Sequence, residues 1–118
     1  MEPSNIAAAL VVHGTTAIVA DPHEIANVLG LDGINYMLED SRFLPFDIFF
    51  TAPSCVPATH LETSGATLQA SDLKGLLNEP RVLGLAEMMN FPGVLMGDDQ
   101  VLEKIILFRN HVLDGHCP

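Results

Sequence analysis

Apolar residues in this chain fall into short runs that are separated by amphipathic segments. Several runs are rich in β-branched or aromatic residues and stop at turn-forming residues, which predicts strands. The predicted strands are Thr15–Ala20, Phe46–Ala52, Val82–Glu87 and the beginning of a fourth at His111–His116. Helix-like segments separate them, at Ile6–Val12, His23–Leu29, Ile34–Phe43, Leu73–Leu77 and Val101–Asn110. This alternation predicts an α/β fold with a parallel sheet and flanking helices.

Local chemistry adds detail to this outline. Thr15–Ala20 is apolar on both faces, which favours a central strand. Pro53–Gly65 is a long loop, and loops of that length in compact domains are usually functional. Ser71 and Asp72 are expected to cap the helix that comes after them, and Asn90–Gly93 is expected to form a turn.

Residues that bind metals or move protons come after each predicted strand. Ligands gather at the carboxyl ends of parallel strands, so these positions predict an active site. Glu87 and His116 end consecutive strands and should be neighbours. A carboxylate can bridge two cations and an imidazole can complete one coordination sphere, so both are candidate metal ligands and catalytic residues. The alternative is a solvated acid and an ordinary loop histidine.

The segment Asp21-Pro22-His23-Glu24 supports two interpretations. Asp21 could cap the helix and Glu24 could interact with the helix dipole, although neither role explains His23. Alternatively, His23 and Glu24 belong to a substrate pocket. Ser54 and Cys55 are further candidates for the pocket wall, since no glycine elbow or partner base supports a nucleophile there.

Composition narrows the possible partners. The chain has 15 acidic and 5 basic residues and a formal charge of -10, which disfavours nucleic acid and anionic membranes as partners. No apolar run approaches the roughly 18 residues of a membrane span. Two cysteines do not make a disulfide framework, so we expect reduced thiols and a cytoplasmic protein. Hydrophobic residues are 48% of the chain, which predicts self-association or a homo-oligomer.

Several strings resemble the adenine deaminases of the amidohydrolase superfamily. They occur in order along nearly the whole chain: His13-Gly14-Thr15-Thr16, Ala20–Val28, Ala52–Pro57, Glu62–Ala66, Gly84–Gly93 and Asp114-Gly115-His116. The resemblance implies a metal-dependent (β/α)8 TIM barrel that hydrolyses adenine to hypoxanthine and ammonia. It also implies a binuclear manganese or iron centre, with Glu87 as the bridging carboxylate and His116 as a histidine ligand.

The resemblance covers only part of that family's pattern. The His-X-His pair of the first barrel strand, a later histidine and the aspartate base have no counterpart here. A complete barrel typically needs about 250 residues. We therefore expect residues 1–118 to be a single partial amidohydrolase domain, covering strands two to five and inactive by itself. The alternatives are a non-catalytic binding or regulatory module, or another amidohydrolase that cleaves a cyclic amide.

Overall fold

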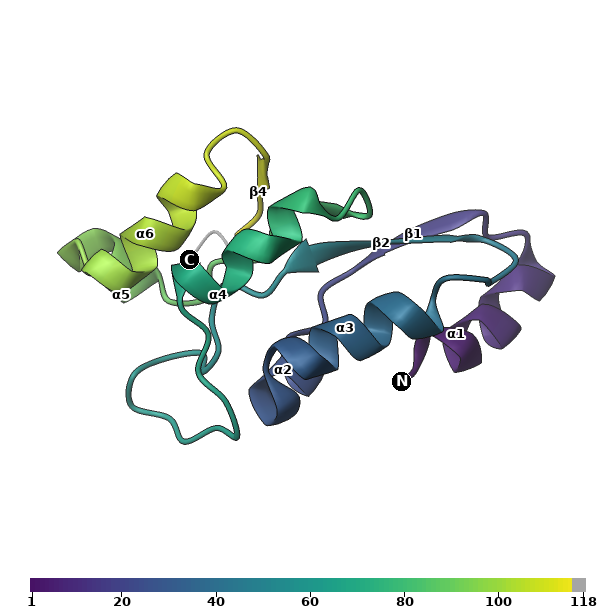
Figure 1. Ribbon diagram of the computed structural model, residues 1–118, viewed down its shortest axis with the longest axis horizontal. Coiled ribbons are helices and arrows are strands. Elements are labelled where there is room, and N and C mark those ends of the chain that lie inside the picture. Colours follow the sequence, from purple (N-terminus) through teal and green to yellow (C-terminus); the bar gives the residue numbers. More distant parts are fainter. Residues whose placement is uncertain (116–118) are drawn as a thin grey trace.

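The computed structural model describes residues 1–115 and contains one sheet of four parallel strands in the order β1-β2-β3-β4 (Figure 1). The strands are β1 (Ala17–Ala20), β2 (Asp47–Ala52), β3 (Val82–Leu85) and β4 (Val112–Leu113). The helices are α1 (Pro3–Leu10), α2 (His23–Leu29), α3 (Leu31–Asp40), α4 (Ala70–Leu73), α5 (Phe91–Met96) and α6 (Asp99–Leu107), with 3₁₀ turns η1 (Val11–His13) and η2 (Lys74–Asn78). The α/β architecture and the parallel sheet are as predicted, and they agree with part of a TIM-barrel-like fold.

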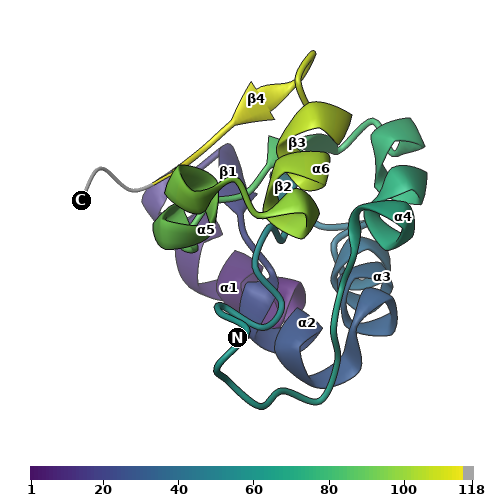
Figure 2. The ribbon, with the colours of Figure 1, turned by 90° about the vertical axis from the view of Figure 1, so that its left-hand side faces the viewer.

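The two faces of the sheet differ in burial. On one face, Ile48 pairs with Ile18 and Phe50 pairs with Ala20, and both residues of β2 are buried in the core. This face packs against apolar side chains of the helices, among them Ile34, Leu38, Leu73 and Leu76. On the other face, Val19 is 60% exposed and Leu83 is 36% exposed. Figure 2 shows α3 and α4 on the same side of the sheet.

Two differences from the sequence-based expectations concern the sheet and its first helix. β1 was expected to be a central strand, but among the described residues it pairs only with β2 and forms an edge. Its apolar outer residues reflect a surface that this part of the chain does not cover. The first helix begins at Pro3 rather than Ile6, because proline already has a helical φ and its missing N–H is not needed there.

The segment Asn90–Gly93 was predicted to form an isolated turn, and that prediction is wrong. The segment is the start of helix α5. The Asn90 side chain accepts a hydrogen bond from the Gly93 N–H at 3.1 Å, and Pro92 lies in the first turn.

A second correction concerns helix α4. Gln69, rather than Ser71, is the N-cap of α4, and Asp72 accepts a hydrogen bond from the Gln69 N–H at 2.8 Å.

β4 approaches β3 closely at Gly84. A Cβ atom at this position would lie 2.0 Å from the Val112 carbonyl oxygen, so only glycine fits without moving β4. Beyond the strands, the Asp114 N–H donates to the Leu85 carbonyl at 3.1 Å, and the Met88 N–H donates to the Asp114 carbonyl at 3.2 Å. These contacts hold the segments after β3 and β4 side by side at the carboxyl edge of the sheet.

Candidate metal centre

Asp21 and His23 come directly after β1 and form the first part of the site. Helix α2 begins at His23, with Pro22 as its N-cap and no side-chain capping hydrogen bond. The Asp21 side chain does not cap the helix, so that interpretation of Asp21 is wrong. Instead, Asp21 Oδ2 lies 3.1 Å from His23 Nδ1, and both side chains are largely buried.

Glu87 reaches the same place from β3. One ligand atom each of Asp21, His23 and Glu87 lies within 4.8 Å of the other two. The strands β1 and β3 are separated by β2, so their axes are roughly 10 Å apart, about twice the usual spacing. β2 ends at the buried Ala52, and the buried Pro53 follows it. The two carboxylates therefore approach each other over the end of β2.

The electrostatics of the cluster match a site for a cation. Burial raises the pKa of Asp21 above its usual value, and the nearby Glu87 carboxylate raises that pKa further, while His23 opposes both effects. Within residues 1–115, Asp21 Oδ1 and His23 Nδ1 are buried and have no hydrogen-bond partner, since the 3.1 Å contact of His23 Nδ1 with Asp21 Oδ2 is at ion-pair distance but is not a hydrogen bond. Unsatisfied buried polar atoms are costly, and a bound cation would satisfy them. Carboxylate oxygens and imidazole nitrogens are common ligands of divalent metal ions.

The predicted ligand His116 lies outside the described residues. Its pairing with Glu87 therefore stays a prediction. Among the described residues, the Met88 N–H donates to the Asp114 carbonyl and joins the segments that follow β3 and β4. The strands that precede Glu87 and His116 are parallel neighbours, as the sequence predicted.

The other predicted site residues occupy different surroundings. Ser54 and Cys55 are buried and line a cavity of ≈ 260 Å³ between the loop after β2 and the start of α6. The Ser54 hydroxyl donates to the Glu87 carbonyl, and the Cys55 thiol lies 3.5 Å from Met88 Sδ. Glu24 is exposed at 81% of its side chain, and its Oε1 lies 3.8 Å from His23 Nε2. The structure thus groups His23 and Ser54 with Glu87, and leaves Glu24 at the surface.

Sequence reasoning missed two members of this region. Asp21 was considered as a cap, although its position directly after a parallel strand is the same signal that identified Glu87. Lys104 was not singled out at all, although it is only 8% exposed and lines the cavity beside Ser54 and Cys55. The pattern of α6 offered a weak signal, since Lys104 lies three residues after the buried Val101.

Comparisons with known proteins agree with these features. The chain is 61% identical over 118 residues to a protein named adenine deaminase from Syntrophobacter fumaroxidans, covering the whole of this chain and 20% of the relative. Proteins of the same name from Desulfatibacillum aliphaticivorans and Clostridium acetobutylicum are 51% and 54% identical over 120 residues, covering 21% of each relative. No family model matches the chain.

The chain spans about a fifth of the length of the curated relatives that it matches. No helix among the described residues has both the length and the apolar character needed to cross a bilayer. The aligned region extends over the entire chain and so includes the positions of Asp21, His23 and Glu87. By sequence, then, this chain is related along its whole length to the adenine deaminases and corresponds to one segment of them.

Proposed function

We propose that this chain is a segment of a metal-dependent deaminase that converts adenine and water to hypoxanthine and ammonia. The observation that carries the proposal is the convergence of Asp21, His23 and Glu87 at the carboxyl edge of a parallel sheet, with buried atoms left unsatisfied among the described residues. When bound, manganese or iron would activate water for attack at the purine carbon that bears the amino group. The same residue types could serve another hydrolase, and the names of the relatives favour adenine as the substrate.

The residues of this chain would have distinct tasks. Glu87 would supply negative charge to the cation from β3, and His116 would supply a nitrogen ligand after β4. Asp21 would add a carboxylate oxygen to the cation, and it would also hold the imidazole of His23, to which it lies close, and so fix its orientation. His23 and Glu24 would contact the purine, and Ser54 and Cys55 would shape the wall behind Glu87.

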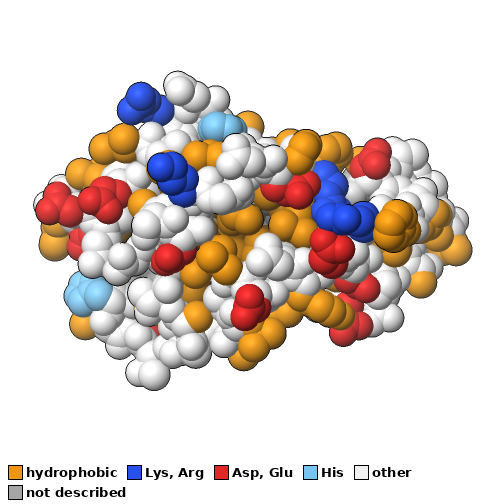
Figure 3. Space-filling view, viewed as in Figure 1, with side chains coloured by type: hydrophobic (Ala, Val, Ile, Leu, Met, Phe, Trp, Pro, Cys, Tyr) orange, Lys and Arg blue, Asp and Glu red, His pale blue; other side chains and the backbone are white. Residues whose placement is uncertain are grey.

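The setting proposed for this enzyme is cytoplasmic purine salvage. Cys55 is a free, buried thiol, which is the usual state of cysteine in a reducing compartment. The surface is acidic overall, with 15 acidic against 5 basic residues. Figure 3 shows acidic side chains spread around a central apolar area on one face of the molecule. Such a surface repels phosphate backbones, so the partner would be a small purine rather than a nucleic acid.

We also propose that the chain self-associates when it is isolated. Val19 on β1 and Val112 and Leu113 on β4 are between 46% and 60% exposed, at the two edges of the sheet. Apolar strands with unpaired backbone groups are normally covered by other protein. A second copy of the chain would cover them, and sedimentation velocity over a concentration series would detect the dimer. A monomer at all concentrations would contradict this expectation.

A chimera provides the test of activity. The corresponding fifth of the Syntrophobacter fumaroxidans relative is replaced by this chain, and conversion of adenine is monitored by absorbance with added Mn²⁺. We expect the chimera to be active and Glu87→Gln to lose at least about 100-fold in kcat, because a ligand is lost.

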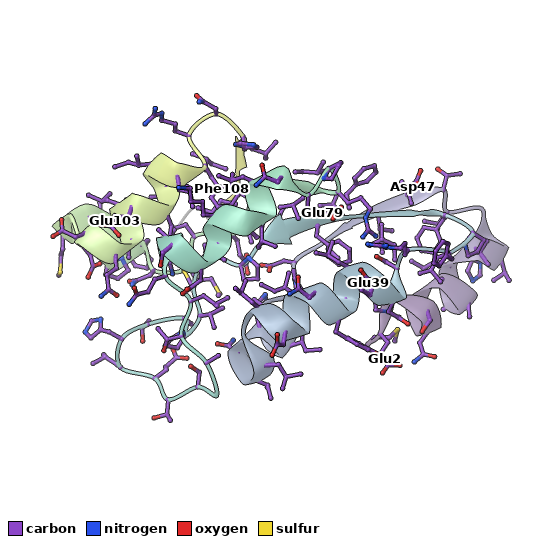
Figure 4. The ribbon with its side chains drawn as sticks, viewed as in Figure 1. Glu2, Glu39, Asp47, Glu79, Glu103 and Phe108 are labelled. Carbon is purple, nitrogen blue, oxygen red and sulfur yellow. The ribbon has the colours of Figure 1, made fainter. Side chains whose placement is uncertain are left out.

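Glu103→Gln is the matched control, since Glu103 is an exposed residue on α6 that points away from the sheet (Figure 4). It should leave kcat unchanged. A folded, metal-loaded chimera without activity would refute the proposed reaction, and so would full activity in Glu87→Gln.

A further inference from the structure

Lys104 is a charged residue in a place where charge is costly. It lies on α6 and is 8% exposed, and its Nζ donates to the carbonyl oxygen of Ser54 at 2.8 Å. The two residues are 50 positions apart, so this bond joins α6 to the loop after β2. Replacing a buried charge by an apolar side chain is often neutral or stabilising. A lysine at this position is therefore poorly explained by stability alone.

Ser54 continues the connection toward the candidate metal centre. Its hydroxyl lies near two acceptors, the Glu87 carbonyl oxygen and Cys55 Sγ, the latter at 3.1 Å. A serine hydroxyl has one proton and donates to one acceptor at a time. Sulfur is the weaker acceptor, so the proton belongs to the Glu87 carbonyl. Ser54 is only 3% exposed.

The backbone on both sides of Glu87 is also held. The Ala86 N–H donates to the Ala52 carbonyl at 2.8 Å, and the Met88 N–H donates to the Asp114 carbonyl at 3.2 Å. The Glu87 carbonyl lies between these two bonds along the chain, and the Ser54 hydroxyl donates to it. With the peptide plane fixed in this way, the direction in which the Glu87 side chain leaves the backbone is fixed as well.

We propose that Lys104 and Ser54 are positioning residues that hold the Glu87 backbone, so that its carboxylate points at Asp21 and His23. Lys104 orients the Ser54 peptide, and the Ser54 hydroxyl then orients Glu87. Neither residue touches the cation or the substrate. This inference rests on the proposed function, because it gives Glu87 the role of a metal ligand. It differs from the predicted role of Ser54 as a residue that touches substrate.

The test compares Mn²⁺ affinity in the chimera described above, measured by titration calorimetry. Ser54→Ala removes the bond to Glu87, and Lys104→Met removes the bond to Ser54 while keeping a similar side-chain volume. Loss of a group that orients a metal ligand typically weakens binding by about 10- to 100-fold. We expect a loss of about 10-fold for each variant. The double variant should bind no more weakly than Ser54→Ala, because the two residues act in series.

Ser41→Ala is the matched control. Ser41 is also a buried serine, and its hydroxyl donates to the Leu38 carbonyl at 2.8 Å, far from the cluster. It should lower stability without changing Mn²⁺ affinity. If Ser54→Ala and Lys104→Met behave like Ser41→Ala, while Glu87→Gln loses Mn²⁺, the positioning role is refuted and the proposed function stands. If Glu87→Gln binds Mn²⁺ as tightly as the unmodified chimera, the proposed function itself is refuted.

Discussion

The two ends of the sheet hold similar groups of charged residues in opposite states. At the amino end, the Arg81 guanidinium, just before β3, donates to Glu79 Oε1 at 3.2 Å, to Ser41 Oγ at 2.7 Å and to the Leu38 carbonyl at 2.9 Å. At the carboxyl end, Asp21 Oδ1 and His23 Nδ1 are buried without a hydrogen-bond partner among residues 1–115.

Figure 4 shows Glu79 and Asp47 away from α5 and α6, toward the amino ends of the strands. A structural charge cluster and a functional one differ in whether their polar atoms find hydrogen-bond partners within the described residues. The amino-end cluster is satisfied by the chain itself and stabilises the fold. The carboxyl-end cluster keeps two buried polar atoms without a hydrogen-bond partner among residues 1–115, as a site that awaits a cation would.

The largest effect is expected where the amino-end cluster is broken. Arg81→Met removes the guanidinium that donates to Glu79 Oε1, Ser41 Oγ and the Leu38 carbonyl, and it leaves the Glu79 charge unpaired in a partly buried place. We expect the free energy of unfolding to fall by about 2–3 kcal/mol, measured by urea denaturation. Arg42→Met is the control, because Arg42 pairs with Glu39 at 2.8 Å on the surface and such pairs contribute less than about 1 kcal/mol. Equal losses of the free energy of unfolding in Arg81→Met and Arg42→Met would show that the Arg81 cluster stabilises the fold no more than a surface ion pair.

The second prediction adds a cation to the carboxyl end. Mn²⁺ at 100 times its dissociation constant should stabilise this chain by about 2.7 kcal/mol, because it binds only the folded state. Asp21→Asn should lose most of this gain at the same Mn²⁺ concentration, whereas Glu79→Gln at the other end should retain it. Urea denaturation with and without Mn²⁺ measures both. A full gain in Asp21→Asn would mean that the cation is held elsewhere.

The smallest effect compares two cationic side chains as pH changes, the buried Lys104 and the partly buried Arg81. Burial lowers the pKa of Lys104, although the nearby side chains of Cys55, Asp72 and Asp98 oppose this effect. The unfolded chain therefore binds the Lys104 proton more tightly than the folded chain does. The free energy of unfolding of the unmodified chain, relative to that of Lys104→Met, should rise as the pH passes through the pKa of Lys104 in the folded chain. It should level off above about 10.5, the ordinary lysine value.

Arginine does not titrate in this range, so the difference between the unmodified chain and Arg81→Met should stay constant from pH 7 to pH 10. Urea denaturation at these two pH values measures both differences. If the difference in the free energy of unfolding between the unmodified chain and Lys104→Met also stayed constant, the Lys104 ammonium would not be disfavoured by burial.

The helix α5 shows why local interpretation fails at some positions. Asn90, Pro92 and Gly93 are typical turn residues, and the same residues are typical of a helix N-terminus. The choice depends on the residues after them, since Gly97 adopts a left-handed conformation with φ 72° and ends the helix there. Only six residues lie between these signals, too few for the hydrophobic period to identify a helix.

The sequence by itself determined the strand order, the parallel direction and the placement of polar residues at the strand ends, because each depends on local periodicity and on short connections. It also identified Glu87 and His23 as candidates for the site. Only the tertiary structure decided that Asp21 meets Glu87 across the end of β2, and that Lys104 reaches Ser54 from α6. Both contacts join residues that are far apart in the sequence. They depend on the length of the side chains and on the small residues that lie between them in space, and no local pattern along the chain contains that information.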